Sequence, residues 1–426
     1  MTDPATFPGP WRALRRHLRP WVVKSADWPL VGEVQRGVYG VQRARVARAL
    51  RRVAPQRTVL LRGSVRRAPR PGLSDLDLVV LLDEGSAAGE RRAIRETLAC
   101  VRRVNRLAPL VRDVTFLTRD DVAILSALDH QLLALVRADH EPLVEGDAEP
   151  WLGDGPSATE EASAIARRHH VGYWTHKGIA QLLREDAPVG PLLAARSFAK
   201  AAGYADPDAR GPVIDVASSE PAGWQDAARA LERLDRVLGA APPHDSRETR
   251  APLRGATDLG PLAQLDATFA VDDEGGIWVA LAPEALDAAS WSALRAGPPA
   301  RLITPRQLAR RAMLPRRGWD ALAPLAPTEA LGPSEIAPGE LAWVARWTLV
   351  EGMFALRERL AEPWSARERR RHERFVLERV PRCWRLTGGQ GEPPTGGVGE
   401  GASPDALHDA ARSVIAASRG NIAASA

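Results

Sequence analysis

The chain has 426 residues, of which 45% are hydrophobic and 26% are charged, with 58 Lys or Arg against 53 Asp or Glu. This balance is typical of a globular protein and excludes a fibrous or largely disordered chain. The only two cysteines, Cys100 and Cys383, exclude a disulfide framework and a four-thiolate zinc site.

The sequence favours a cytoplasmic protein without a membrane partner. The N-terminal residues show no apolar core followed by a small-residue cleavage site. Apolar runs such as Leu78–Leu82 are far shorter than the roughly 20 residues that cross a bilayer. We therefore expect neither export nor membrane insertion.

Positive charge is concentrated at the start of the chain. Residues 1–70 hold sixteen Lys or Arg and three Asp or Glu, a balance of +13 against +5 for the whole chain. Such a segment can bind a polyanion such as nucleic acid, or it can solvate the outer faces of helices. We favour solvated helix faces, because the arginines follow helical periods and are not interleaved with aromatic residues.

The first part of the chain predicts an α/β order of elements. Apolar residues at near-helical spacing, with Val38, Val41 and Val53 among them, predict a helix over Val38–Val53. β-branched and apolar runs predict strands that alternate with further helices. The expected order is strand Thr58–Leu61, strand Asp75–Leu82, helix Gly85–Leu107, strand Leu110–Leu117 and helix Asp121–Val136.

The rest of the chain predicts mainly helices, after a turn-rich stretch near residue 150. A hairpin is expected where Thr268–Val271 and Ile277–Leu281 flank Asp-Asp-Glu-Gly-Gly. We therefore expect a first domain over 1–150, a mainly helical substrate-binding domain over 151–386, and a flexible glycine-rich linker with a short terminal helix over 387–426. The predicted helices are Thr159–Glu185, Pro191–Gly203, Trp224–Leu238, Leu341–Leu360, Ala366–Val380 and Asp405–Ala417.

One stretch of the sequence, residues 59–82, contains residue types that can bind phosphate and divalent cations. A predicted strand delivers Gly63 and Ser64 into a loop, and the next strand begins with Asp75 and Asp77, which project from one face of an extended chain. Glycine lets backbone amides approach phosphate oxygens, and paired carboxylates can hold divalent cations. Asp113, in the following predicted strand, supplies a third acid.

These residues resemble the motif of the nucleotidyltransferase superfamily of DNA polymerase beta type. The motif is an apolar strand, Gly-Ser, about ten residues, then Asp-apolar-Asp-apolar, with a third acid on a later strand. Here the likeness covers about residues 40–150. Arg67 occupies the place of the family's usual arginine, but Ala68 replaces the glycine that commonly follows it.

The resemblance implies an α/β nucleotidyltransferase core, a mixed sheet with flanking helices, joined to a mainly α-helical C-terminal domain. It implies two Mg²⁺ ions held by Asp75, Asp77 and Asp113, and a nucleoside triphosphate, ATP by preference, bound by Gly63, Ser64 and Arg67. The expected activity is transfer of a nucleoside monophosphate to a hydroxyl of a small molecule or protein. The alternative is a non-catalytic nucleotide- or nucleic-acid-binding protein on a vestigial fold of this family.

Two further features belong to the predicted helix Thr159–Glu185. His169, His170 and His176 lie beside apolar residues, so we interpret the histidines as core residues rather than zinc ligands. Lys177 is one of only three lysines and lies on a predicted polar stripe with His170, Tyr173, Gln181 and Arg184. In related nucleotidyltransferases a helix of the second domain brings a cation to the triphosphate, which implies a nucleotide-binding role for Lys177.

Overall fold

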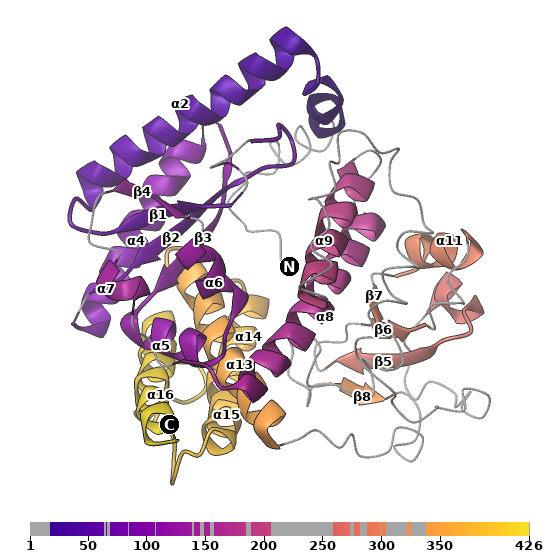
Figure 1. The fold of residues 1–426 in the computed structure, drawn as a ribbon. Helices are drawn as coiled ribbons and strands as arrows, with labels where there is room; N and C mark the ends of the chain where they lie inside the picture. Colours follow the sequence, from indigo (N-terminus) through magenta and orange to yellow (C-terminus); the bar gives the residue numbers. More distant parts are fainter. Residues whose placement is uncertain are drawn as a thin grey trace. The chain divides into compact units, whose positions relative to one another are not determined.

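The computed structural model describes residues 18–425 except 64, 66–68, 84, 107, 139, 145–148, 154–156, 185–188, 206–258, 273–276, 282–287, 299, 304–321 and 325–337. The chain forms two units, one of residues 1–163 and 345–426 and a second of residues 164–344 (Figure 1). This division differs from the predicted boundaries at 150 and 386, because the last helices return to the first unit. The predicted helix Trp224–Leu238 lies outside the described residues.

The first unit is built on a mixed four-stranded sheet in the order β3-β2-β1-β4. Strand β1 is antiparallel to β2 and β4, whereas β2 and β3 run parallel and are joined through helix α4. This confirms the predicted α/β order, and it adds β4, which the sequence analysis missed. The strands are β1 Val59–Arg62, β2 Leu76–Leu81, β3 Val111–Leu117 and β4 His140–Val144.

Helices α2 (Pro29–Val53) and α4 (Ala87–Asn105) cover one face of this sheet. Leu61 and Leu78 pair across strands and face these helices, and both are fully buried. Leu60 and Val79 pair on the opposite face and are also fully buried. A sheet buried on both faces explains why its strands are continuous apolar runs.

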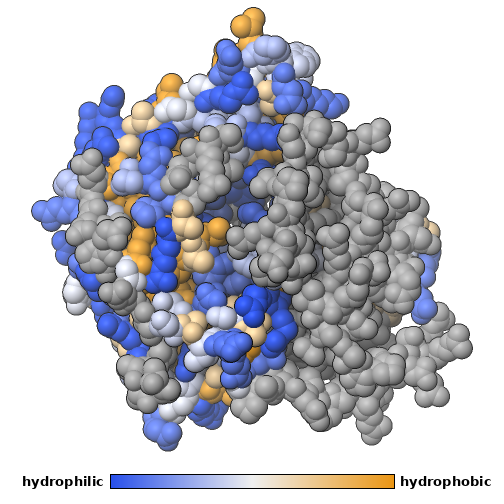
Figure 2. All heavy atoms as spheres, viewed as in Figure 1, coloured by the Kyte–Doolittle hydropathy of each residue, from blue (hydrophilic) through white to orange (hydrophobic). Residues whose placement is uncertain are grey.

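The buried face of α2 differs from the predicted one. Val38, Val41 and Val53 are exposed, by 45%, 62% and 41% respectively, while Tyr39 and Gln42 are buried. The physical reason is hydrogen bonding: the Tyr39 hydroxyl donates to the Ser74 carbonyl, and the Gln42 amide donates to the carbonyls of Val104 and Ala108. Figure 2 shows apolar side chains among hydrophilic ones on the visible surface of the first unit.

The predicted helix Asp121–Val136 is two helices, α5 (Arg119–Ala127) and α6 (Gln131–Ala138). Asp129 takes a φ of 48°, which ends the first helix, and His130 Nδ1 accepts a hydrogen bond from the Leu132 amide at the start of the second. The His130 ring also stacks on Trp347, 3.8 Å between centroids. A short helix α7 (Glu149–Leu152) follows β4.

The C-terminal part of the first unit is helical, with an irregular glycine-rich connection at 387–403. The terminal helix is longer than predicted, and it packs against α5 and α4. The elements are the end of α13 (Pro338–Arg359), α14 (Ala366–Arg374), a π-helix (Phe375–Arg379), α15 (Val380–Leu386) and α16 (Pro404–Ser425).

The second unit combines helices with a second four-stranded sheet, in the order β7-β6-β5-β8. The predicted hairpin is confirmed as the antiparallel pair β5 and β6. The sequence analysis missed the two outer strands. Its elements are most of α8 (Glu160–Arg184), α9 (Val189–Ala205), a 3₁₀ turn (Gly260–Gln264), β5 (Thr268–Asp272), β6 (Ile277–Ala280), α11 (Ala288–Ala296), β7 (Ala300–Ile303) and β8 (Leu322–Pro324).

Candidate active site

The candidate site is built where β1 ends and β2 begins. Gly63 follows β1 with a φ of 89°, and a Cβ at this position would lie 3.2 Å from Oδ2 of Asp77. A side chain here would need a strained backbone and would press on the carboxylate, so glycine fits both constraints. Ser64 and Arg67, the other predicted phosphate contacts in this loop, lie outside the described residues.

Asp77 and Asp113 occupy adjacent positions of neighbouring parallel strands. Leu76 pairs with Val111 and Leu78 with Val114, so the register shifts at Asp77, and Arg112 and Asp113 together oppose it. Asp113 precedes Val114 as Asp77 precedes Leu78, which places both acids on the same face of the sheet. Bulges of this kind are common beside active sites, where they redirect a side chain.

Asp75 lies two residues before Asp77, immediately before β2 begins. Its Oδ2 accepts a hydrogen bond from Arg112 Nη1 at 3.2 Å, and the carboxylate is 17% exposed. Within the described residues, no group of three His, Cys, Asp or Glu side chains is arranged to hold a metal ion. The structure thus brings Asp77 and Asp113 to one place and pairs Asp75 with an arginine.

The donor set nevertheless fits a hard divalent cation. Carboxylate oxygens are the ligands that Mg²⁺ prefers, and the register places two carboxylates, Asp77 and Asp113, on one sheet face. Asp75 fits as a further ligand if its carboxylate gives up the hydrogen bond from Arg112 and binds the metal instead. Asp77 and Asp113 are therefore the residues around which a metal would bind.

Arg62 is a residue of the site that the sequence analysis missed. It pairs directly with Asp77 across the antiparallel strands β1 and β2, so both side chains lie on one face. Its Nε is buried and has no hydrogen-bond partner among the described residues. A buried guanidinium N–H without an acceptor is costly, and a phosphate oxygen would satisfy it. The sequence feature that could have identified Arg62 is its position immediately before Gly63 and Ser64.

Lys177 belongs to the second unit, on α8. Its Nζ lies 4.8 Å from the centroid of the Trp174 ring, and Nζ of Lys200 lies 3.9 Å from the same centroid. Two of the chain's three lysines thus converge on one indole, in a protein whose basic residues are otherwise arginines apart from Lys24. The nucleotide-binding role of Lys177 stays a prediction.

The predicted polar stripe around Lys177 is not a uniformly solvated face. His170 is buried next to Tyr204, 5.1 Å between ring centroids, and Gln181 accepts a hydrogen bond from the Ser197 hydroxyl of α9. The stripe is therefore partly covered by α9. Arg184 and His176 have side chains outside the described set.

The core interpretation of His169 and His170 is confirmed by their burial, 4% and 2% exposed. The His169 ring packs against Trp343, 4.8 Å between centroids. Burial, and to a smaller extent the neighbouring His170, lower the pKa of His169 to about 3. The ring is therefore neutral at physiological pH.

Comparison of the chain with protein-family models, with curated proteins and with solved structures finds no match. Among the described residues, no helix has both the length and the apolar character needed to span a membrane.

Proposed function

We propose that this chain is a metal-dependent nucleotidyltransferase that moves a nucleoside monophosphate from ATP to a hydroxyl of a small molecule or a protein. The observation that carries the proposal is the strand register, which sets Asp77 beside Asp113 on one sheet face, with Gly63 against the Asp77 carboxylate. The resemblance of the Gly-Ser and Asp-x-Asp motifs to the polymerase beta superfamily supports the same conclusion.

The residues have distinct roles in such a transfer. The acceptor oxygen attacks the α-phosphorus, the bond to the bridging oxygen breaks, and pyrophosphate leaves. Asp113 orients the acceptor hydroxyl and accepts its proton. Gly63 and Arg62 contact the phosphates that leave, together with Ser64 and Arg67 of the loop.

Asp75, Asp77 and Asp113 would hold the Mg²⁺ ions. Bound Mg²⁺ would neutralise the phosphate charge and polarise the acceptor oxygen. The carboxylates in turn fix where the positive charge lies, and Arg62 adds a cation at the phosphate side of the sheet.

The ion pair between Asp75 and Arg112 favours the alternative function, a non-catalytic nucleotide-binding protein. An arginine that neutralises Asp75 takes over part of the charge balance that a metal would provide. The two functions differ in one measurable respect, since only the enzyme releases pyrophosphate.

The test compares Asp77→Asn, near the start of β2, with Asp83→Asn, two residues after the end of β2. Asp83 is 69% exposed and pairs with Arg119 at the surface, so it serves as a matched acid-to-amide control. Each protein is incubated with Mg²⁺, ATP labelled at the α-phosphate, and extracted metabolites or proteins. We expect Asp77→Asn to lower transfer by at least about 100-fold, and Asp83→Asn to retain it.

Thermal melting separates loss of function from loss of fold. Both variants should melt as the wild type does without nucleotide, and Mg²⁺-dependent stabilisation by ATP should be lost only in Asp77→Asn. Wild-type protein that is stabilised by ATP and Mg²⁺ but releases no pyrophosphate would establish the binding protein instead. Full transfer by Asp77→Asn would show that the activity does not use the proposed carboxylate site.

A further inference from the structure

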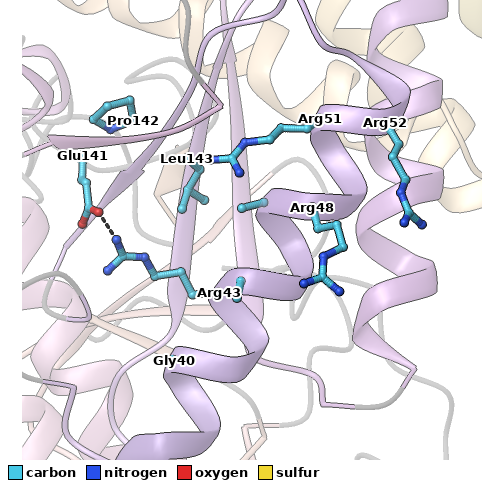
Figure 3. Close-up of a pocket in the computed structure, with 10 residues that line it drawn as sticks. Gly40, Arg43, Arg48, Arg51, Arg52, Glu141, Pro142 and Leu143 are labelled. Atoms are coloured by element: carbon cyan, nitrogen blue, oxygen red, sulfur yellow. Dashed lines mark hydrogen bonds and ion pairs between the residues drawn. The ribbon is translucent and has the colours of Figure 1, made fainter.

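An arginine-lined groove lies on the first unit, between helix α2 and strand β4. Its volume is about 660 Å³, within the range of ligand sites. Figure 3 shows Arg43 reaching Glu141 on one side, Arg51 extending toward Leu143, and Arg48 and Arg52 pointing in a common direction. The groove is thus a concave surface with several cationic side chains.

The groove carries excess positive charge. Glu141 is its only acidic lining residue, and this carboxylate is engaged in an ion pair with Arg43. Arg48, Arg51 and Arg52 are exposed and form no ion pair with any described carboxylate. Three guanidinium groups therefore remain to attract an anion.

Other arginines of the same unit contrast with these. Arg91, Arg95 and Arg102 of α4 each pair with a carboxylate of the C-terminal part of this unit. Positive charge is thus neutralised within the protein where α4 packs, and it is left available where α2 meets β4. This difference separates a binding surface from a solvated helix face.

The arrangement suits phosphate groups that repeat along a chain. Guanidinium groups bind phosphate oxygens through paired N–H donors. Arg48 and Arg52 are one helical turn apart, about 6 Å along the axis, so they present two successive donors. The remaining lining is apolar, with Ala44, Ala47 and Leu143, and can contact sugars or bases without sequence readout.

Two other polyanionic partners fit the groove less well. An acidic peptide that added a strand to β4 would need backbone donors along this edge, but Pro142 has no N–H at the centre of the strand. An anionic membrane requires a surface that can lie flat on the bilayer, whereas these arginines line a groove between α2 and β4. A flexible strand with a phosphodiester backbone needs neither backbone donors from β4 nor a flat protein surface.

We infer that this groove binds the phosphodiester backbone of a single-stranded nucleic acid, through Arg48, Arg51 and Arg52. The inference rests on the groove alone and holds whether or not the chain is a nucleotidyltransferase. RNA and DNA share the chemistry that these arginines recognise, so the experiment distinguishes the two.

The experiment measures fluorescence anisotropy of labelled oligouridine RNA and oligothymidine DNA of about 12 nucleotides with the full-length chain. We expect the triple variant R48Q/R51Q/R52Q to bind at least about tenfold more weakly, and its log affinity to depend less steeply on log salt, by about 2 units of slope. The matched control is R367Q/R369Q/R370Q, three exposed arginines of α14, which should bind as the wild type does.

A variant expected to bind more tightly provides an independent test. Glu141→Gln releases Arg43 and removes the one acidic residue that lines the groove. The affinity for the oligonucleotides should therefore rise about threefold, which corresponds to the free energy of an exposed ion pair. Stronger binding of RNA or of DNA identifies the natural strand. Equal losses in the two triple variants, or equally tight binding of a polyglutamate probe, would overturn the inference.

Discussion

Arg62 is the residue in which local structure and chemistry are most closely linked. Its position in β1 opposite Asp77 follows from the antiparallel register, and its Nε is buried without a partner among the described residues. A buried N–H group that donates to no acceptor costs the free energy of its desolvation. The arrangement is explained if a ligand supplies an acceptor.

Arg62→Gln should therefore weaken nucleotide binding without weakening the fold. We expect the KM for ATP, or its Kd measured by calorimetry in the presence of Mg²⁺, to rise at least about tenfold, equivalent to about 1.4 kcal/mol. Arg57→Gln is the control, because the Arg57 guanidinium already has a carboxylate partner, Glu96. An unchanged Kd together with a lower melting temperature would show that Arg62 supports the strand rather than the ligand.

At the scale of elements, close packing of α13 against the π-helix depends on a glycine. A Cβ at Gly352 would lie 2.0 Å from Cε2 of Phe375, the first residue of the π-helix. A π-helix turn interrupts regular hydrogen bonding and changes the direction of the following side chains. The ring of Phe375 thus occupies the space that a side chain on α13 would need.

Gly352→Ala should destabilise the first unit by about 1–3 kcal/mol, although alanine is the better helix former by about 1 kcal/mol. Gly37→Ala on α2 provides the matched control, because no atom lies within 4 Å of a Cβ at that position. It should raise stability by up to about 1 kcal/mol. Urea unfolding midpoints of the two variants should move in opposite directions, and a shift in the same direction would contradict the packing argument.

The sequence predicted elements well where one physical signal dominated. Continuous apolar runs located β1, β2 and β3, and the spacing of Gly63, Asp75, Asp77 and Asp113 located the candidate site. Local patterns could not reveal features set by distant contacts, such as the edge strand β4 with its central Pro142. Likewise, burial of Gln42 depends on carbonyls more than sixty residues away.

At the scale of the whole molecule, buried charges hold the two ends of the chain in one unit. Arg357 of α13 is 1% exposed and donates to Glu90 of α4, 2.9 Å, and to Asp121 of α5, 2.5 Å. His408 and Arg412 of α16 also contact Glu90, at 3.1 Å and 2.9 Å. These contacts span more than 200 residues, which is why the C-terminal helices belong to the first unit.

The pKa of Glu90 makes this network sensitive to acid. Burial alone would raise the pKa of the carboxyl, but the charge of Arg357 and the hydrogen bonds from His408 and Arg412 outweigh burial and hold it at about 2. An unfolded Glu has its pKa near 4.5. The unfolded state therefore binds the proton first, so the stabilisation is complete above the unfolded pKa and is lost as pH falls toward 2.

Glu90→Gln tests the network because it keeps the shape of the side chain and removes its titration. The wild type should lose on the order of 3 kcal/mol of unfolding free energy through Glu90 between about pH 5 and pH 2, and Glu90→Gln should lack this component. At neutral pH the variant should be less stable by about 3–5 kcal/mol, since Arg357 keeps its buried charge with one carboxylate fewer. Glu96→Gln, the partner of Arg57 at the surface, should change stability by less than about 1 kcal/mol and preserve the acid transition. Urea unfolding at a series of pH values measures both quantities, and an acid-induced loss as large in Glu90→Gln as in the wild type would place the titrating group elsewhere.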